Sequence, residues 1–255
     1  MLIVTEFEFY NLFLRLQFIL AIVTVIILIF VVAPYGRHTR KGWGRMLPVA
    51  SSWVIMELPT VLLFAFFFFT GKHSFELVPL VFLGMWQLHY LHRTFVFPFR
   101  MRSVGQSIPA LIPLLAIGFN TLNSYLNARW IGHLGKYELE WITSFPFLIG
   151  STLFLIGWFG NLHADAILRN LRKPGEAVYQ IPTGGLYRWV SSPNYLCEIL
   201  EWTGWAIATW STAGLAFAVY TIANLAPRAV HHHIWYLSYF ENYPRERKAL
   251  IPYLF

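Results

Sequence analysis

Seven largely apolar stretches constrain the fold of this chain more than any other feature of the sequence. A helix that crosses a bilayer needs about 20 mostly apolar residues. The expected helices cover residues 12–33, 47–70, 77–97, 108–122 and 145–163, and two more begin near residues 194 and 213, the last continuing toward 236. The sequence therefore predicts an all-α membrane bundle of about seven transmembrane helices, in a single domain over residues 1–255.

The composition supports lipid as part of the solvent. Hydrophobic residues make up 57% of the chain and charged residues only 12%, whereas a soluble domain has about 25% charged residues. The formal net charge of +7 comes from Lys and Arg in short loops, which indicates membrane topology and not nucleic-acid binding. The first apolar stretch has no basic leader or clear cleavage site, so we expect it to be retained. The many aromatic residues are expected to face lipid and the membrane interface.

The positive charges alternate from loop to loop and predict the orientation. Basic residues cluster after the first, third and fifth stretches and in the C-terminal tail, whereas the intervening loops hold few of them. Because cytoplasmic loops carry the excess of Lys and Arg, the N-terminus is expected outside and the C-terminus in the cytosol. This pattern requires an odd number of spans. It predicts a multi-pass protein of a bacterial inner membrane or of the endoplasmic reticulum.

Glu57 and Tyr90 are polar residues at membrane depth and need an explanation. Glu57 is about ten residues from the cytosolic end of its helix, or roughly 15 Å at 1.5 Å per residue, and Tyr90 is roughly 10–12 Å deep. The two side chains could meet between sequential antiparallel helices. A glutamic acid among apolar walls favours its protonated form. Two such donors could hold a carbonyl oxygen that gains negative charge, or they could simply join two helices.

Three helices each carry a polar stripe near the cytosolic side. Residues three or four positions apart share a helix face. The stripes consist of Asn161, Asp165, Arg169 and Arg172; of Asn194, Glu198 and Glu201; and of Arg228, His232 and Tyr236. One such stripe could be a solvated face, but three with mixed acid, base and amide chemistry favour a shared, large polar ligand. Arginines suit its phosphates, and carboxylates and amides suit its ribose and amide groups.

Other chemical sites are not indicated. The three consecutive histidines 231–233 point about 100° apart on a helix and cannot converge on one metal ion. The stretch 182–186 has two adjacent glycines but lacks the spacing of a dinucleotide fingerprint, and no strand precedes it. Cys197 is the single cysteine and is most simply a packing residue. We therefore expect no metal site and no Rossmann domain.

Several segments together resemble the membrane steroid 5-alpha-reductase family. The most specific lie in the C-terminal part: NLHAD at 161–165, LRNLRKPGE at 168–176, IPTGGL at 181–186, NYLCEILEW at 194–202, HHH at 231–233 and YPRERKALIP at 243–252. Upstream, ELP at 57–59 and HYLHRTF at 89–95 match two shorter family signatures. Two positions depart from the family pattern: Met56 replaces a glutamine, and Gln180 stands where a basic residue is expected.

The resemblance implies a seven-helix enzyme that uses NADPH, bound at the cytosolic side, to reduce the 4,5 double bond of a 3-oxo-4-ene steroid. By this analogy Glu57 and Tyr90 hold the 3-keto oxygen, and Trp53 forms a wall of the steroid pocket. The residues implied for the cofactor are Asn161, Asp165, Arg172, Asn194, Glu198, Arg228, His232 and Tyr236. Residues 1–105 would carry the steroid-site helices, and 145–255 would carry most of the NADPH site.

Alternative functions remain open on the residues alone. Membrane methyltransferases of the isoprenylcysteine type place a cytosolic cofactor pocket near a segment like Ser192 to Tyr195, and they use S-adenosylmethionine. A reductase of a polyprenol or an enoyl thioester, or a sterol-binding or transport protein, could also carry an acid–phenol pair. The expected partners are a steroid-like lipid and the membrane, with no nucleic acid and no obligate protein partner.

Overall fold

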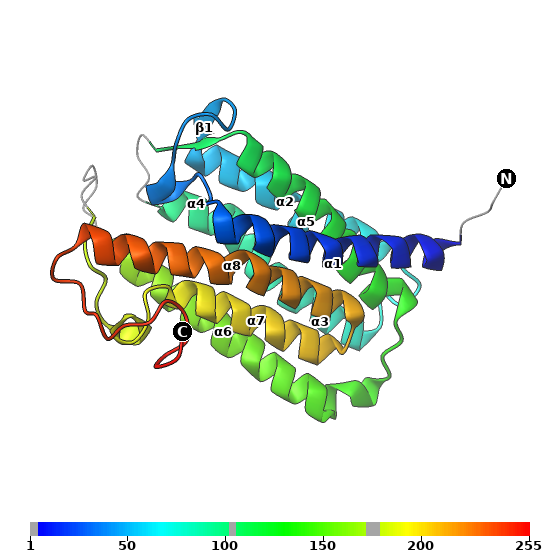
Figure 1. Ribbon diagram of the computed structural model, residues 1–255. Coiled ribbons are helices and arrows are strands. Elements are labelled where there is room, and N and C mark those ends of the chain that lie inside the picture. Colours follow the sequence, from blue (N-terminus) through cyan, green and yellow to red (C-terminus); the bar gives the residue numbers. More distant parts are fainter. Residues whose placement is uncertain (1–4, 102–105, 172–178) are drawn as a thin grey trace.

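The protein is a bundle of long helices with roughly parallel axes (Figure 1). The computed structural model describes residues 5–101, 106–171 and 179–255. Its α-helices are α1 (Glu6–Phe30), α2 (Val49–Phe69), α3 (Leu77–Leu91), α4 (Phe97–Arg100), α5 (Leu111–Arg129), α6 (Phe145–Asn170), α7 (Pro193–Thr209) and α8 (Thr212–Tyr239). Short π-helical segments, His92–Val96 and Trp130–Leu134, continue α3 and α5, and 3-10 turns cover Gly36–His38, Leu139–Thr143 and Gly185–Arg188.

The surface of the bundle confirms an all-α membrane protein. Within the described residues, α1, α2, α6 and α8 are long and apolar enough to cross a bilayer. Their exposed side chains are large and apolar, as at Ile26, Phe66 and Ile156, each more than half exposed. Water would penalise such a surface and lipid would not. α1 begins at one end of the bundle, and the strand β1 and the C-terminal tail lie at the opposite end (Figure 1).

Two short strands and the C-terminal tail close the end of the bundle opposite the N-terminus. β1 (Met46–Pro48) pairs antiparallel with β2 (Ser107–Pro109), with Leu47 opposite Ile108. The pairing joins the starts of α2 and α5, because each strand leads directly into its helix. At the tail, Val190 pairs with Lys248, and the loop before α7 is thereby tied to the last residues of the chain.

α5 is longer than the apolar pattern predicted. The expected helix ended before Asn123, but α5 continues to Arg129. The polar side chains that suggested an end are buried and paired: Asn123 accepts a hydrogen bond from Gln17 of α1 at 3.0 Å, and Asn127 accepts one from the indole of Trp205 at 2.9 Å. The helix continues because neighbouring helices satisfy these groups.

Part of the aromatic content lies in the core, contrary to the expectation that it faces lipid. The indoles of Trp86, Trp202 and Trp205 are almost completely buried, whereas Phe30 and Phe145 are exposed as expected. The Trp86 and Trp202 rings lie 5.5 Å apart. Aromatic rings fill space between helices and favour such tilted contacts. The aromatic cluster joins α3 to α7 at the base of the site described below.

α6 and α7 approach closely because glycines face each other between them. A Cβ at Gly157 would meet the backbone of Glu201 and Cys197, and a Cβ at Gly204 would meet the backbone of Phe154. Small residues allow helix backbones in membranes to pack in direct contact. The carboxylates on α7 are therefore held at a set distance from the polar stripe of α6.

We expect Gly157→Ala to destabilise the protein, because the added methyl group must push two backbones apart. Overpacking of this kind costs about 1–3 kcal/mol, which is measured as a lower thermal midpoint in a fixed detergent. Gly118→Ala on α5 is the matched control, since its Cβ would meet nothing within 4 Å and alanine favours a helix over glycine by about 1 kcal/mol. Equal midpoints for the Gly157 variant and the parent would contradict the packing account.

Candidate functional site

A cavity of about 340 Å³ lies between the helices and is here called the central cavity. This volume lies within the range of small-molecule sites. Glu57 and Trp53 reach it from α2, Tyr90 from α3 and Glu198 from α7. α1, α5 and α8 supply further walls, so the cavity extends beyond the part of the chain expected to surround a steroid.

Pro59 shapes α2 next to Glu57. Proline lacks an N–H, so one carbonyl of the preceding turn loses its helical partner and the helix is open to outside donors. Side chains from other helices bond this part of the backbone: Asn120 of α5 donates to the Met56 carbonyl at 2.7 Å, and Trp86 of α3 donates to the Thr60 carbonyl at 2.9 Å. These contacts fix α2 against α3 and α5 at the level of Glu57.

Glu57 and Tyr90 line the same cavity, and each is held by its surroundings. The Glu57 carboxylate oxygen Oε2 accepts a hydrogen bond from Asn120 Nδ2 at 3.3 Å. The Tyr90 ring stacks on Trp202, with centroids 5.5 Å apart, and contacts Trp86 at 4.8 Å. Its hydroxyl group makes no hydrogen bond to any of the residues that the structure describes. That hydroxyl is therefore available to a ligand in the cavity.

His89 and Glu201 form a buried pair behind Tyr90. The imidazole Nδ1 and the Glu201 Oε1 are 2.7 Å apart, and both side chains are almost inaccessible to solvent. The imidazole also packs edge-on against the Tyr90 ring at 4.8 Å. Glu201 shares a helix face with Asn194 and Glu198, as the spacing predicted, but its carboxyl group turns to His89. Glu201 therefore holds the imidazole that packs against the Tyr90 ring, and its carboxyl group does not join the polar groups of Asn194 and Glu198.

Arg93 lies between α3 and the carboxylates of α6 and α7. The sequence analysis treated it only as one of the basic residues that predict the membrane orientation. Its guanidinium lies 3.4 Å from Asp165 of α6 and 3.7 Å from Glu198 of α7. The same group lies over the rings of Phe97 at 4.3 Å and Trp53 at 5.1 Å. The only signal in the sequence was its place in the segment 89–95, one turn after Tyr90.

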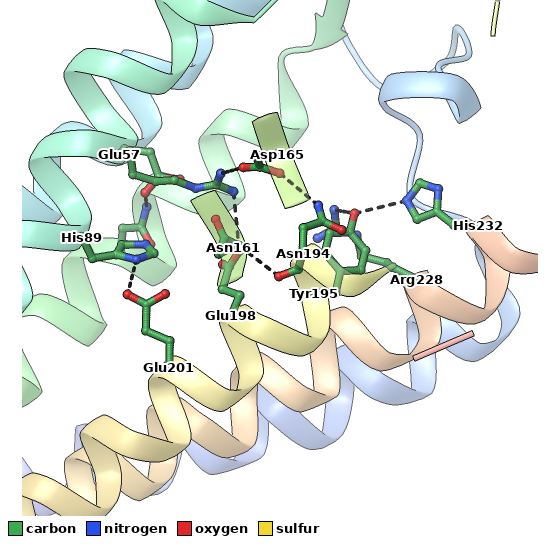
Figure 2. Close-up of polar contacts among 12 residues, drawn as sticks. Glu57, His89, Asn161, Asp165, Asn194, Tyr195, Glu198, Glu201, Arg228 and His232 are labelled. Carbon is green, nitrogen blue, oxygen red and sulfur yellow. Dashed lines mark hydrogen bonds and ion pairs between the residues drawn. The ribbon is translucent and has the colours of Figure 1, made fainter. Parts of the chain in front are cut away.

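A second cavity, of about 260 Å³, lies beyond this ion pair toward the loops and is here called the loop-side cavity. Asp165, Asn194 and Tyr236 line it, as do three arginines, Arg37, Arg100 and Arg169. In Figure 2, Glu57 lies on one side of the polar cluster and His232 on the other, with Asp165 between them. The acid–phenol pair thus faces the central cavity, and three of the predicted cofactor residues, Asp165, Asn194 and Tyr236, face the loop-side cavity.

The three predicted polar stripes meet through direct contacts. Asn194 donates to Asp165 at 3.3 Å, which links α7 to α6. Asn161 donates to the Asn194 carbonyl at 3.0 Å and to Glu198 at 3.4 Å, and these bonds hold α7 against α6. Asn161 itself lines neither of the two cavities. Arg172 lies outside the described residues.

The stripe on α8 is joined to α7 by Tyr195. Arg228 donates to the Tyr195 hydroxyl at 2.6 Å, and the same oxygen lies 3.1 Å from His232 Nε2. Arg228 also lies over the ring of Tyr35 at 4.7 Å. Arg228 faces the central cavity, whereas His232 lies behind it.

Arg37, in the loop after α1, is a site residue. The sequence analysis treated it only as one of the basic residues that predict the membrane orientation. It donates to the Tyr236 hydroxyl at 3.1 Å and lies over the rings of Trp235 at 4.6 Å and Tyr236 at 4.4 Å. Burial first, and then the nearby charge of Arg37, lowers the pKa of the adjacent His38 to about 4. That imidazole is neutral near pH 7 and adds no positive charge beside the arginines.

The residues of the loop-side cavity and its surroundings suit a ligand with phosphate groups. Two nitrogens, Arg37 Nη1 and His232 Nδ1, are buried without a hydrogen-bond partner among the described residues, although buried polar groups are normally paired. Arginine side chains bind phosphate oxygens through paired N–H groups. The described residues include no cluster of three metal-ligating side chains. The donor set therefore suits an anionic organic ligand.

The chain is similar to proteins named steroid 5-alpha-reductase or 3-oxo-5-alpha-steroid 4-dehydrogenase. The profile of the 3-oxo-5-alpha-steroid 4-dehydrogenase family matches residues 106–255. Steroid 5-alpha-reductase DET2 of Gossypium hirsutum is 42% identical over 93% of this chain and 94% of its own length. The 3-oxo-5-alpha-steroid 4-dehydrogenase 1 of Homo sapiens is 43% identical over 87% of this chain and 86% of its own length.

Proposed function

Because the chain belongs to the 3-oxo-5-alpha-steroid 4-dehydrogenase family, we propose that it reduces the 4,5 double bond of 3-oxo-4-ene steroids with NADPH. The products would be 5-alpha-3-oxosteroids. One observation carries the proposal: Glu57 and Tyr90, from different helices, line a single cavity of about 340 Å³. Glu198 and Arg228, two of the residues expected to hold the cofactor, line the same cavity.

The acid and the phenol would act on the ketone of the enone. When bound, NADPH would supply a hydride to the beta carbon. As that carbon becomes saturated, the electrons of the double bond shift toward the ketone oxygen, and hydrogen bonds from Glu57 and Tyr90 stabilise the negative charge that develops there. A proton then adds at the alpha carbon, which leaves a saturated ketone and NADP⁺. The apolar walls of the cavity exclude water and hold the reacting carbons together.

The cofactor would lie across both cavities. Asp165, Asn194 and Tyr236 line the loop-side cavity with three arginines, and Glu198 and Arg228 line the central one. We assign Asn161 and His232 to orienting these groups, and we keep Arg172 as a proposed contact. The Arg37 nitrogen Nη1, which has no hydrogen-bond partner among the described residues, adds a phosphate donor on the loop side, where Gln180 departs from the basic residue of the family pattern.

All seven long helical segments are proposed to cross the membrane. α3 passes through a π-helical turn into α4 without a break, which lengthens a helix that is short by itself, and α7, with 17 residues, spans about 26 Å. The positive loops predict an N-terminus outside and a C-terminus in the cytosol. The loop-side cavity then faces the cytosol, where NADPH is available.

The decisive experiment incubates purified protein in detergent with NADPH and a panel of 3-oxo-4-ene steroids, and identifies the products by mass spectrometry and NMR. We expect NADPH oxidation only when a steroid is present, and a 5-alpha product. A parallel binding assay compares NADPH with S-adenosylmethionine. Binding of S-adenosylmethionine alone would favour a methyltransferase, and steroid binding without NADPH oxidation would indicate a sterol-binding protein; either result would overturn the proposal.

A further inference from the structure

Asn120 of α5 touches both the backbone and the side chain of the Glu57 region. Its Nδ2 atom lies 2.7 Å from the Met56 carbonyl oxygen and 3.3 Å from Glu57 Oε2. The side chain is only 8% exposed and lines the central cavity. Nothing in the sequence reasoning singled it out, because Asn120 lies within an apolar stretch and its partner is 63 positions away.

The contact with Met56 determines which way the Asn120 amide points. A backbone carbonyl can only accept a hydrogen bond, so the atom that faces it must be the amide nitrogen and not the amide oxygen. The same nitrogen faces Glu57 Oε2 and has a second N–H for it. Glu57 Oε2 must therefore accept a hydrogen bond.

This assignment has a consequence for the acid. A protonated carboxyl group has one carbonyl oxygen, which accepts, and one hydroxyl oxygen, which donates. Since Asn120 can only donate to Oε2, the proton of neutral Glu57 belongs on Oε1. We propose that Asn120 is a positioning residue that directs the acidic proton of Glu57 onto Oε1. The Oε1 hydroxyl then donates a hydrogen bond to the ketone oxygen of the substrate.

This inference rests on the proposed function, because it needs Glu57 to act as a hydrogen-bond donor. A purely structural role is the competing explanation, since Ser124, one turn further along α5, also bonds α2 at the Pro59 carbonyl. A structural role predicts a loss of stability without a change in the hydrogen bonding of Glu57. A positioning role predicts lower turnover and altered bonding of the Glu57 carboxyl group in protein that is still folded.

The test uses two variants, Asn120→Leu, which has a similar volume without a donor, and Asn120→Ala, which avoids any clash. We expect kcat to fall by roughly tenfold, as for the loss of one hydrogen bond, with little change in the KM for NADPH. Infrared difference spectra against Glu57→Gln identify the carboxylic acid C=O band of Glu57. That band should move to higher frequency in both variants, because the C=O loses its donor.

Asn127→Ala on the same helix is the matched control. Asn127 is buried and hydrogen-bonded to Trp205 but does not line the central cavity, so it should lower the thermal midpoint and leave kcat and the infrared band unchanged. An unshifted band together with parental kcat in either Asn120 variant would overturn the inference, as would the lack of a carboxylic acid band that Glu57→Gln removes. A parent protein that does not reduce enones would instead overturn the proposed function.

Discussion

Glu57→Gln and Tyr90→Phe are each expected to lower kcat by about 100- to 1000-fold, the usual effect of losing one donor to a developing oxyanion. The two groups come from different helices but line one cavity, and the Tyr90 hydroxyl makes no hydrogen bond to the described part of the chain. Each change keeps the shape of the side chain. Steady-state kinetics with a 3-oxo-4-ene steroid measures the loss, and a binding titration should show nearly unchanged affinity for NADPH.

Tyr137→Phe is the matched control for the loss of a buried phenol. The Tyr137 hydroxyl donates to the Thr209 carbonyl at 2.7 Å, away from both cavities. This variant should lose stability, by about 1 kcal/mol, and keep the parental kcat. If both Glu57→Gln and Tyr90→Phe turned over at the parental rate, the oxyanion role would be wrong even if the protein reduced steroids.

Arg93→Met is expected to lower the stability of the protein more than any other substitution proposed here. The change leaves Asp165 and Glu198, both largely buried, without their shared cation, and removal of one partner from a buried ion pair costs about 3–5 kcal/mol. NADPH affinity should also fall, because the freed carboxylates would face the phosphates of the cofactor. The thermal midpoint and an NADPH titration, both in one detergent, measure the two effects.

Two further substitutions separate charge from geometry. Arg93→Lys keeps the charge but loses the planar guanidinium that reaches two carboxylates at once, so an intermediate midpoint is expected. Arg188→Met removes an exposed arginine and should change the midpoint little, as most surface substitutions do. A parental midpoint for Arg93→Met would show that the ion pair does not join α3 to α6 and α7.

Local patterns predicted the helices well because they depend on neighbours in the chain. The apolar stretches and the shared face of Asn194 and Glu198 both follow from residues within a few positions of one another. The apolar pattern failed at α5, where it ended the helix at Asn123. The partner that satisfies Asn123, Gln17, is 106 positions away.

The sequence by itself therefore determined an all-α membrane protein, the faces of its polar stripes and, through the family resemblance, the candidate residues of the site. Only the tertiary structure decided which side chains meet: Asn120 with Glu57, His89 with Glu201 across 112 positions, and Arg93 with both Asp165 and Glu198. Helix periodicity sets the direction of a side chain relative to its own axis. Its partners depend on how whole helices pack, and in this bundle that packing depends on glycine contacts and buried hydrogen bonds between distant segments.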